Sequence, residues 1–444
     1  MEWQTVIAFI VGVLVVVVGL ALSIGLHEIG HLVPAKLFGV RVSQYMIGFG
    51  PTLWSRKKGE TRYGVKLLPL GGFIAMSGMF PPASDGAARD RSRSFFGAMV
   101  QDARDSSSES VRPGEEDRAF YRKPVWQRII IMLGGPLMNL VLATVLFAII
   151  LLGIGLPQAS TTIGSLSTCV VPASRADQTT CQADDPAAPG QAAGLKPGDK
   201  IVSIDGTKIT SWMQATELIR KSAGAHLDFV VHRDGTERTI AVTPMLSERY
   251  AFDAAGHAVL GADGKPTTVQ VGFIGIGPAT ERVAQPVATV VETVGTTISG
   301  VVGVVVNLPQ RLIAVAEAAF GPGERDPNGP ISVVGVGRAA GEIASVDSAP
   351  VIDRVAVLLG LLASLNIALF VFNLIPLLPL DGGHVLGAIV EAVRRRFAKL
   401  FKRADPGPID MARFMPVTFV VVIVLVAMSA LLIYADIVKP VKIF

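Results

Sequence analysis

The sequence has few charged residues, few aromatic residues and only two cysteines. Charged side chains make up 17% of the 444 residues and aromatic side chains 7%, so we see no basic and aromatic platform for nucleic-acid bases and expect no nucleic-acid partner. Hydrophobic residues make up 50%, which is typical of a membrane protein that carries some soluble mass. The net charge of +4 is small, and we expect much of the excess to flank membrane spans.

The N-terminus lacks the features of a cleaved secretory signal. It begins Met1-Glu2-Trp3-Gln4, without a basic segment, and no clear small-residue cleavage site follows. The apolar run after it is longer than the hydrophobic part of a signal peptide. We therefore expect this run to be retained.

Four apolar segments are long enough to cross a bilayer, since about 20 helical residues span the hydrocarbon. They cover about residues 6–26, 129–156, 355–380 and 417–434. Lysine and arginine gather in the loops after the first and the third of these segments. Basic loops stay in the cytoplasm, which places both termini and residues 157–353 outside and brings the ends of the first and third segments to the same membrane depth.

Both cysteines, Cys169 and Cys181, fall in the segment that is expected to lie outside. A disulfide between them is therefore chemically allowed. The sequence does not show their separation in the fold, so a disulfide and two free thiols both remain open.

The first apolar run leads directly into His27-Glu28-Ile29-Gly30-His31. If the helix continues, His27 and His31 lie four residues apart on one face and can bind a single Zn2+, with Glu28 beside it to take a proton from water. The alternative is an interfacial cluster of polar residues at a helix end. Ionisable residues at the end of a span are costly unless they are paired, metal-bound or functional, which favours the zinc site.

A second stretch, at the end of the third apolar segment, supplies the rest of this site. A catalytic zinc needs three protein ligands and an open position, and Asp381 is the natural third ligand, although a plain helix-end carboxylate facing water is the alternative. Pro376 and Pro379 break the helix and free carbonyl groups that can bind a peptide. Asn373 offers a donor and an acceptor to an extended substrate or an oxyanion. His384 is a less favoured ligand, because a fourth one would close the position for water.

Residues 39–80, in the first basic loop, contain turn and strand signals. Residues 48–51 (Gly-Phe-Gly-Pro) predict a turn, and residues 62–68 and 73–76 predict two short strands joined by a glycine-rich turn at residues 69–72. An ordinary surface hairpin is one interpretation. Because the hairpin is apolar and lies beside the membrane, it can also dip inward and offer a strand edge to a peptide.

Two further segments have no clear place in the four-span pattern. Residues 81–117 are rich in Ser, Asp, Arg and Gly without periodicity, and we expect a disordered cytoplasmic insert. Residues 287–320 are apolar but interrupted by polar residues, and we expect helices at the outer interface. This second expectation assumes the metal site, because a fifth span would move Asp381 to the face opposite the histidines.

The external segment contains the run Ala193-Gly194-Leu195-Lys196-Pro197-Gly198-Asp199-Lys200-Ile201. A helix at residues 212–222 and strands at 227–233 and 236–243 follow. This pattern resembles a bacterial PDZ domain, a fold that binds extended peptides by strand addition. A small globular plug without a ligand is the alternative, since a fold does not fix a function.

The motifs together resemble the site-2 protease family of intramembrane zinc metalloproteases, in its bacterial PDZ-containing branch of the regulator of sigma-E protease type. They follow the family's order along nearly the whole chain: residues 27–31, 48–50, 69–72, 135–139, the PDZ-like run, 329–332 and 373–383. The chain departs from some relatives in its single PDZ-like domain and in the polar insert.

The resemblance implies a role for each motif. His27, His31 and Asp381 are the implied zinc ligands, and Glu28 is the implied catalytic base. The hairpin is the implied membrane-associated β-loop that presents substrate. The implied substrate-positioning residues are Asn373, Gly48, Gly50, Gly71 and Gly72.

The resemblance also implies a biological setting. The expected substrates are single-pass membrane proteins, anti-sigma factors foremost, that another protease has already shortened outside the membrane. The PDZ-like domain is then a size filter or a reader of the new C-terminus. Two other classes of protein remain as alternatives: a peptide receptor with structural histidines, and a metal transporter that uses the same three ligands as a transit site.

We therefore expect a multi-pass α-helical protein of the bacterial plasma membrane with about four transmembrane helices, a β-hairpin and an extracytoplasmic α+β domain. Its expected parts are a first span with the zinc motif (1–38), the β-loop (39–80), the disordered insert (81–118), a second span (119–156), the PDZ-like domain (157–285), interfacial helices (286–353), a third span with the Asp381 motif (354–393), and a basic loop with the fourth span (394–444).

Overall fold

The computed structural model describes residues 3–82, 95–171, 173–175, 180–251, 258–261, 264–327 and 329–441, without the side chains of residues 69, 70 and 174. The chain forms two compact units. The helical unit comprises Met1–Ile154 and Gln285–Phe444, and the β-rich unit comprises Gly155–Ala284.

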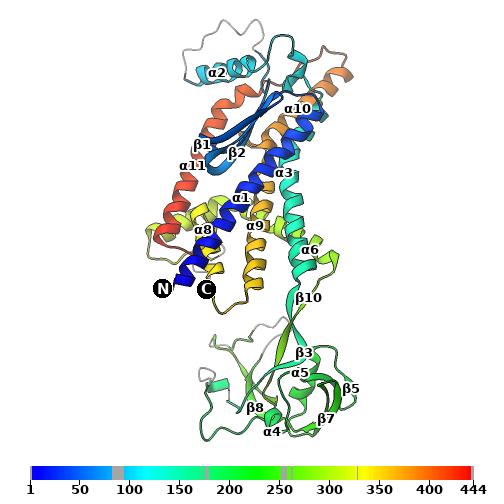
Figure 1. The fold of residues 1–444 in the computed structure, drawn as a ribbon. Helices are drawn as coiled ribbons and strands as arrows, with labels where there is room; N and C mark the ends of the chain where they lie inside the picture. Colours follow the sequence, from blue (N-terminus) through cyan, green and yellow to red (C-terminus); the bar gives the residue numbers. More distant parts are fainter. Residues whose placement is uncertain are drawn as a thin grey trace. The chain divides into compact units, whose positions relative to one another are not determined.

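Five helical stretches in the described part of the chain are long and apolar enough to cross a membrane. Four of them correspond to the predicted spans, and the fifth lies in the segment expected to be interfacial. In Figure 1, α1 runs obliquely through the helical unit and α3 and α9 pack beside it. The five stretches are α1 (Trp3–Leu37), α3 (Val125–Ala148) with η3 (Ile149–Ile154), α6 (Val287–Val306), α9 (Val351–Asn373) and η5 (Met411–Phe414) with α11 (Met415–Val438).

The fifth stretch, α6, adds a candidate to the predicted count of about four spans. Four of the five polar residues that argued against a span lie at or beyond its end, where α7 (Leu308–Phe320) begins, and only Glu292 lies inside its 20 residues. The four are Asn307, Pro309, Gln310 and Arg311. After α8 (Val333–Ala344), α9 begins at the end of the unit where α3 ends, and α8 itself contacts Gly12 near the start of α1 (Figure 1). Residues 287–350 therefore make no net crossing, and their interfacial position stays a prediction.

The two strands of the β-loop form a hairpin whose turn differs from the predicted one. β1 (Val42–Lys58) and β2 (Thr61–Met76) are joined at Gly59 and Glu60. The prediction of a turn at residues 69–72 is wrong, because these residues continue β2.

Both strands of the hairpin bend, so that the first half of β1 lies between the two halves of β2. Ile47 pairs with Val65 on one side and with Gly72 on the other. The predicted strands 62–68 and 73–76 therefore correspond to paired segments that are not each other's neighbours. The predicted turn at residues 48–51 is instead a bend inside β1, where Gly48 and Gly50 adopt positive φ angles of +91° and +86°.

The insert between the β-loop and α3 contains helical structure where the sequence predicted disorder. Residues 83–94 lie outside the described residues, but α2 (Phe95–Glu109), η1 (Glu116–Arg118) and η2 (Phe120–Arg122) follow them. Phe95 of α2 packs edge-on against Phe419 of α11, and Arg104 forms an ion pair with Asp410. These contacts stabilise a helix in a segment whose polar composition had indicated disorder.

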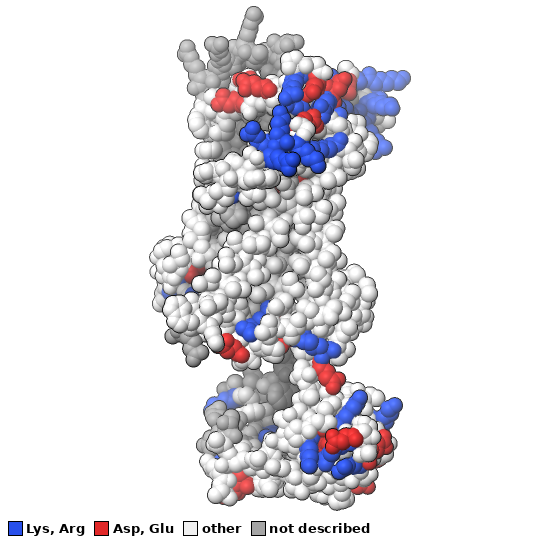
Figure 2. Space-filling view, viewed as in Figure 1, with Lys and Arg blue, Asp and Glu red and all other residues white. Residues whose placement is uncertain are grey.

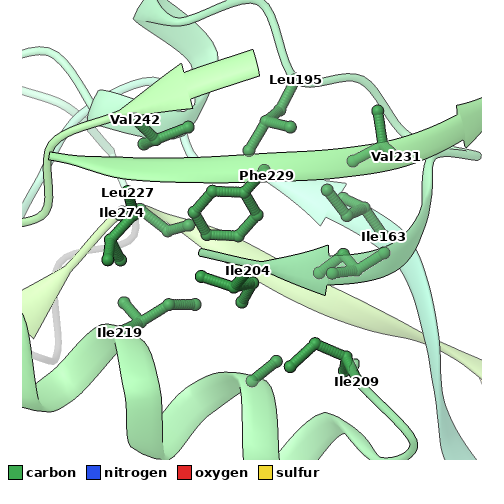
Figure 3. Packing of buried hydrophobic residues seen from close by; sticks show 12 residues of the cluster. Ile163, Leu195, Ile204, Ile209, Ile219, Leu227, Phe229, Val231, Val242 and Ile274 are labelled. Atoms are coloured by element: carbon green, nitrogen blue, oxygen red, sulfur yellow. The ribbon is translucent and has the colours of Figure 1, made fainter. Parts of the chain in front are cut away.

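The β-rich unit has a core of its own around Phe229, which is completely buried (Figure 3). Its main sheet has the strand order β10-β3-β4-β6-β7, with β5 beside β4, and β8 pairs with β9. β6 buries alternate residues, as expected for a strand with one face on a core. The elements are β3 (Leu156–Leu166), η4 (Ala173–Arg175), α4 (Pro189–Ala192), β4 (Lys200–Ile204), β5 (Thr207–Lys208), α5 (Trp212–Lys221), β6 (Leu227–Arg233), β7 (Thr236–Val242), β8 (Met245–Tyr250), β9 (Thr268–Phe273) and β10 (Ile276–Val283).

The helix and the two strands predicted in this unit match α5, β6 and β7 to within one residue. Its identity as a PDZ domain stays a prediction. The sequence left open whether Cys169 and Cys181 form a disulfide or remain free thiols. In the structure they form a disulfide, with their Cα atoms 5.8 Å apart.

Charge is unevenly distributed over the helical unit. On the face shown in Figure 2, Lys and Arg gather at one end of this unit, and a broad zone next to it has almost no charged side chains. This pattern is typical of a membrane protein whose basic loops lie on one side of the bilayer.

Candidate functional site

The two histidines of the first motif lie together because α1 continues without interruption through Leu37. His27 and His31 are one helical turn apart, and their Nε2 atoms lie 3.2 Å from each other. His31 is buried, with 4% of its surface exposed. The motif therefore forms the predicted pair on one helix face.

Asp381 completes this cluster from the far end of the chain. It is the first residue of α10 (Asp381–Leu400), and its Oδ2 atom lies 3.4 Å from Nε2 of His27 and 3.3 Å from Nε2 of His31. Ligand atoms at about 2.0–2.1 Å from a tetrahedral zinc lie about 3.3–3.4 Å from one another. The three atoms thus fit around one zinc ion, and Oδ2 is buried without a hydrogen-bond donor among the described residues.

The outer nitrogen of each histidine contacts α3. His31 Nδ1 lies 2.7 Å from the carbonyl oxygen of Ile131, and His27 Nδ1 lies 3.1 Å from the side-chain amide of Asn139. A histidine that donates from Nδ1 keeps the Nε2 lone pair for a metal. Both Nε2 atoms accordingly point toward Asp381.

Glycines allow α1 and α3 to approach closely at this point. A Cβ atom on Gly30 would lie within 3.0 Å of the backbone of Gly134, and one on Gly135 would lie within 3.0 Å of the His31 ring. Small residues at a helix crossing permit such contact between spans. The Gly134-Gly135 pair therefore sets how near His31 lies to α3.

Glu28 is buried beside the cluster, and its side chain faces β2. A Cβ atom on Gly72 would lie 3.0 Å from Cγ of Glu28 and 2.9 Å from Ile24 on the same helix. Only 8% of the Glu28 surface is exposed. The second half of β2 thus passes directly beside the predicted base.

The other predicted positioning glycines shape the β-loop. Gly48 packs against the Leu68 carbonyl, Gly71 (φ +139°) packs against the Phe49 ring, and Gly50 has open space around its Cα. The described neighbours of Gly48 and Gly71 are within the sheet, whereas Gly72 adjoins Glu28.

Two polar residues of the second motif lie outside the cluster. Asn373 is the last residue of α9, and its amide nitrogen donates to the Leu369 carbonyl 3.0 Å away. His384 lines a small cavity next to Arg128 and Glu391, and the group of three ligand atoms described above does not include it. Asp381, and not His384, thus belongs to the group of three neighbouring ligand atoms, and its role as a zinc ligand stays a prediction.

The predicted site residues do not include the two groups of α3 that contact the histidine Nδ1 atoms, the Asn139 side chain and the Ile131 carbonyl. The sequence could have indicated Asn139, because an amide inside an apolar span is costly without a partner. It could not have indicated the carbonyl of Ile131, since every residue has a backbone carbonyl.

Comparison with known proteins decides the family. The model of peptidase family M50 matches residues 15–404. The chain belongs to peptidase family M50. A zinc metalloprotease Rip1 from Mycobacterium tuberculosis is 32% identical over 450 residues, covering 98% of this chain and 99% of the relative.

More distant relatives match most of the chain as well. The metalloprotease MmpA of Caulobacter vibrioides is 30% identical, with 88% of this chain and 89% of the relative covered. The zinc metalloprotease RasP of Geobacillus kaustophilus is 28% identical, with 83% and 86% covered. The resemblance to site-2 zinc metalloproteases is therefore confirmed, and this chain is a zinc metallopeptidase. The receptor and transporter alternatives lose their support.

Proposed function

We propose that His27, His31 and Asp381 hold the zinc ion and that Glu28 is the general base of an intramembrane protease. The observation that carries this proposal is the spacing of the three ligand atoms, which lie 3.2–3.4 Å from one another. Residues from both ends of the chain converge there and supply three protein ligands, the number that is typical of a catalytic zinc site.

The chain's own residues have distinct tasks in the reaction. The three ligands would hold the zinc ion, which would supply Lewis-acid chemistry for acidifying water and polarising the scissile carbonyl. Glu28 takes the proton that the attacking water releases and passes it to the leaving amine nitrogen. Glu28 follows His27 directly in α1 and is itself buried, so it stays close to the ligands and away from bulk water.

The second half of β2 is suited to hold the substrate as an added strand. Residues 72–76 pair with β1 along one edge, and Gly72 lies against Glu28. A helical substrate hides its carbonyl groups in its own hydrogen bonds, so it must unwind before cleavage, and an added strand is a stable unwound form. Asn373 is proposed to hold the peptide, and Gly48, Gly50 and Gly71 to shape the β-loop that presents it.

The proposed substrates are single-pass membrane proteins that another protease has shortened, anti-sigma factors foremost. The β-rich unit contains a cavity of about 270 Å³ between α5 and the strands β8 to β10. The Arg249 guanidinium stacks 3.5 Å from the centre of the Phe273 ring in its lining, and Arg220 lies nearby. Two guanidinium groups beside an apolar cavity suit a newly made C-terminus, whose carboxylate they can bind.

The proposed location follows from the basic loops. We place the protein in the plasma membrane of a bacterium, with the β-rich unit and both termini outside and the catalytic cluster toward the cytoplasmic side. Proteomics of membrane fragments in cells that carry Glu28→Ala then tests the substrate class, since half-trimmed single-pass proteins are expected to accumulate.

The decisive test of the catalytic assignment uses purified protein reconstituted with a single-pass substrate. Glu28→Ala is expected to lower the cleavage rate about 10²–10⁴-fold, the usual contribution of a general base, while the zinc content stays at the wild-type value. Asp381→Ala and His31→Ala are expected to lose zinc, measured by mass spectrometry of the metal. Cleavage by Glu28→Ala at the wild-type rate, or full zinc content in both ligand variants, would contradict the assignment.

A further inference from the structure

Asn139 is a fully buried amide in the middle of the membrane-spanning helix α3, with 0% of its surface exposed. A polar side chain in such a position is costly unless it is paired or functional. Its described hydrogen-bond contact is with Nδ1 of His27, at 3.1 Å, and the two residues are 112 positions apart in the chain. The amide therefore has a specific relation to one proposed zinc ligand.

The chemistry of the imidazole decides which amide atom faces it. Nε2 of His27 points at His31 and Asp381, so its lone pair is directed to the metal position and the ring proton is on Nδ1. Nδ1–H is a donor, and its partner must be an acceptor.

The orientation of the Asn139 amide follows from this. The amide nitrogen lies toward Nδ1 of His27, while Oδ1 is buried without a partner among the described residues. A half turn of the amide exchanges oxygen and nitrogen without moving any other atom. Oδ1 then accepts from Nδ1–H of His27, which satisfies both the buried oxygen and the zinc-binding tautomer.

We propose that Asn139 is a positioning residue for the metal centre, which accepts a hydrogen bond from His27 Nδ1–H and thereby fixes the tautomer and the ring orientation of that ligand. This inference rests on the proposed ligand set. Groups that orient a zinc-bound histidine in this way commonly change metal affinity about 10–100-fold when they are removed. Asn139 does not touch the substrate in this role, and it acts only through His27.

The second histidine shows the same arrangement with a different partner. His31 Nδ1 lies 2.7 Å from the carbonyl of Ile131, which belongs to α3 as well. One helix thus supports both histidines, with its backbone for His31 and with a side chain for His27. Only the support from Asn139 can be removed by a side-chain substitution.

Asn366 on α9 provides a matched control. It is also 0% exposed, and its Oδ1 also has no partner in the described part of the chain. Its amide nitrogen, however, donates to Ser23 Oγ and to the Leu362 carbonyl, at 2.9 and 2.8 Å, and to neither proposed histidine ligand. Asn366→Leu therefore imposes the same change in a similar environment without touching a ligand.

The test measures zinc affinity of the full-length protein in detergent by competition with a chelator, together with the visible absorption spectrum of the Co2+-loaded protein. Asn139→Leu is expected to weaken zinc binding about 10–100-fold and to alter the Co2+ spectrum. Asn139→Asp, which keeps an acceptor oxygen, is expected to stay within about threefold of wild type, and so is Asn366→Leu. A role in packing alone predicts the reverse order, since leucine fills an apolar site better than a carboxylate.

Equal zinc affinity of Asn139→Leu and wild type, or tighter binding by Asn139→Leu than by Asn139→Asp, overturns the inference. If Asn139→Leu does not fold, Asn139→Asp is compared with Asn139→Ala, and equal affinities of these two overturn it. His27→Ala separates this result from a failure of the ligand set. Zinc loss in His27→Ala with wild-type affinity in Asn139→Leu refutes only the role of Asn139, whereas full zinc content in His27→Ala refutes the ligand set.

Discussion

Asp199 of the β-rich unit is a buried carboxylate that is held by several hydrogen bonds and lies outside the candidate membrane spans. Its carboxylate is completely buried and accepts from Arg233 Nε and Nη2, at 2.5 and 2.6 Å, and from the Lys196 backbone nitrogen at 2.8 Å. Burial alone would raise the pKa of Asp199, but the hydrogen bonds from Arg233 and Lys196 outweigh it and lower this pKa below its usual value of 3.8.

The lowered pKa of Asp199 predicts an acid-sensitive β-rich unit. Because the folded state holds the proton more weakly than the unfolded state, this carboxylate stabilises the fold fully above the unfolded pKa and loses that effect as the pH falls through the folded pKa. Asp199→Asn leaves Arg233 without its anion and is expected to cost about 3 kcal/mol near neutral pH. Limited proteolysis with pepsin between about pH 2 and 5 checks the pH dependence.

The wild-type β-rich unit is expected to become more susceptible to pepsin as the pH falls through this range, and Asp199→Asn is expected to be susceptible throughout with a flatter profile. Glu217→Gln is the control, because Glu217 forms an exposed pair with Lys221 and contributes little to stability. Parallel profiles of Asp199→Asn and wild type would show that Asp199 is not the sensitive group.

At the scale of elements, the metal centre depends on where helices begin, end and cross. α9 ends at Asn373, a short irregular stretch with Pro376 and Pro379 follows, and α10 begins with Asp381. The break turns the carboxylate back toward α1, which a continuous helix would not do. The crossing of α1 and α3 over glycines then fixes the distance between His31 and its support.

Because α1 and α3 cross so closely, we expect a single added methyl group at Gly135 to lower the zinc affinity. A Cβ atom on Gly135 would lie within 3.0 Å of the His31 ring, including Nε2, so Gly135→Ala must displace that ring or separate the helices. We expect zinc affinity to fall about tenfold or more, the range seen when ligand orientation is disturbed. Chelator competition measures it.

Gly153→Ala is the matched control for this change, because no other group lies within 4 Å of a Cβ atom there although Gly153 belongs to the same membrane stretch. Its zinc affinity is expected to stay at the wild-type value. Equal affinities of the two variants would mean that the crossing tolerates the methyl group and that His31 is not positioned by it.

At the scale of the whole molecule, the β-rich unit is a self-contained insertion in the helical unit. The chain enters it at Gly155 and leaves it at Ala284, and the two ends pair with each other, with Leu156 of β3 opposite Val283 of β10. The unit also has its own core around Phe229. An insertion whose ends are adjacent can be removed without separating the parts that flank it.

We expect that replacing residues 155–284 by a short glycine linker removes the selectivity for trimmed substrate. If the β-rich unit filters substrates, the shortened protein is expected to keep its zinc and to cleave untrimmed single-pass substrate at about the rate of trimmed substrate. Cleavage of both substrates in reconstituted vesicles measures this, and the same deletion with Glu28→Ala controls for contaminating proteases. An unchanged preference for trimmed substrate would refute the filter.

The sequence by itself determined the features that depend on neighbours along the chain. The four-residue spacing of His27 and His31 places both on one face of any continuous helix, and long apolar runs form spans because the bilayer requires about 20 such residues. The position of Asp381 at the end of such a run was unusual enough to predict its role as a ligand. The local pattern likewise located α5, β6 and β7.

Only the tertiary structure decided the features that depend on contacts between distant residues. No spacing pattern in the sequence indicates three of the contacts described above. These are the pairing of Ile47 with both Val65 and Gly72, the disulfide between Cys169 and Cys181, and the contact of Asn139 with His27. A glycine-rich stretch can reverse a chain or bend a strand, and its own residues do not distinguish these outcomes. The reason is physical: hydropathy and spacing report a residue's burial and its face, whereas the partner on that face is set by packing of the whole fold.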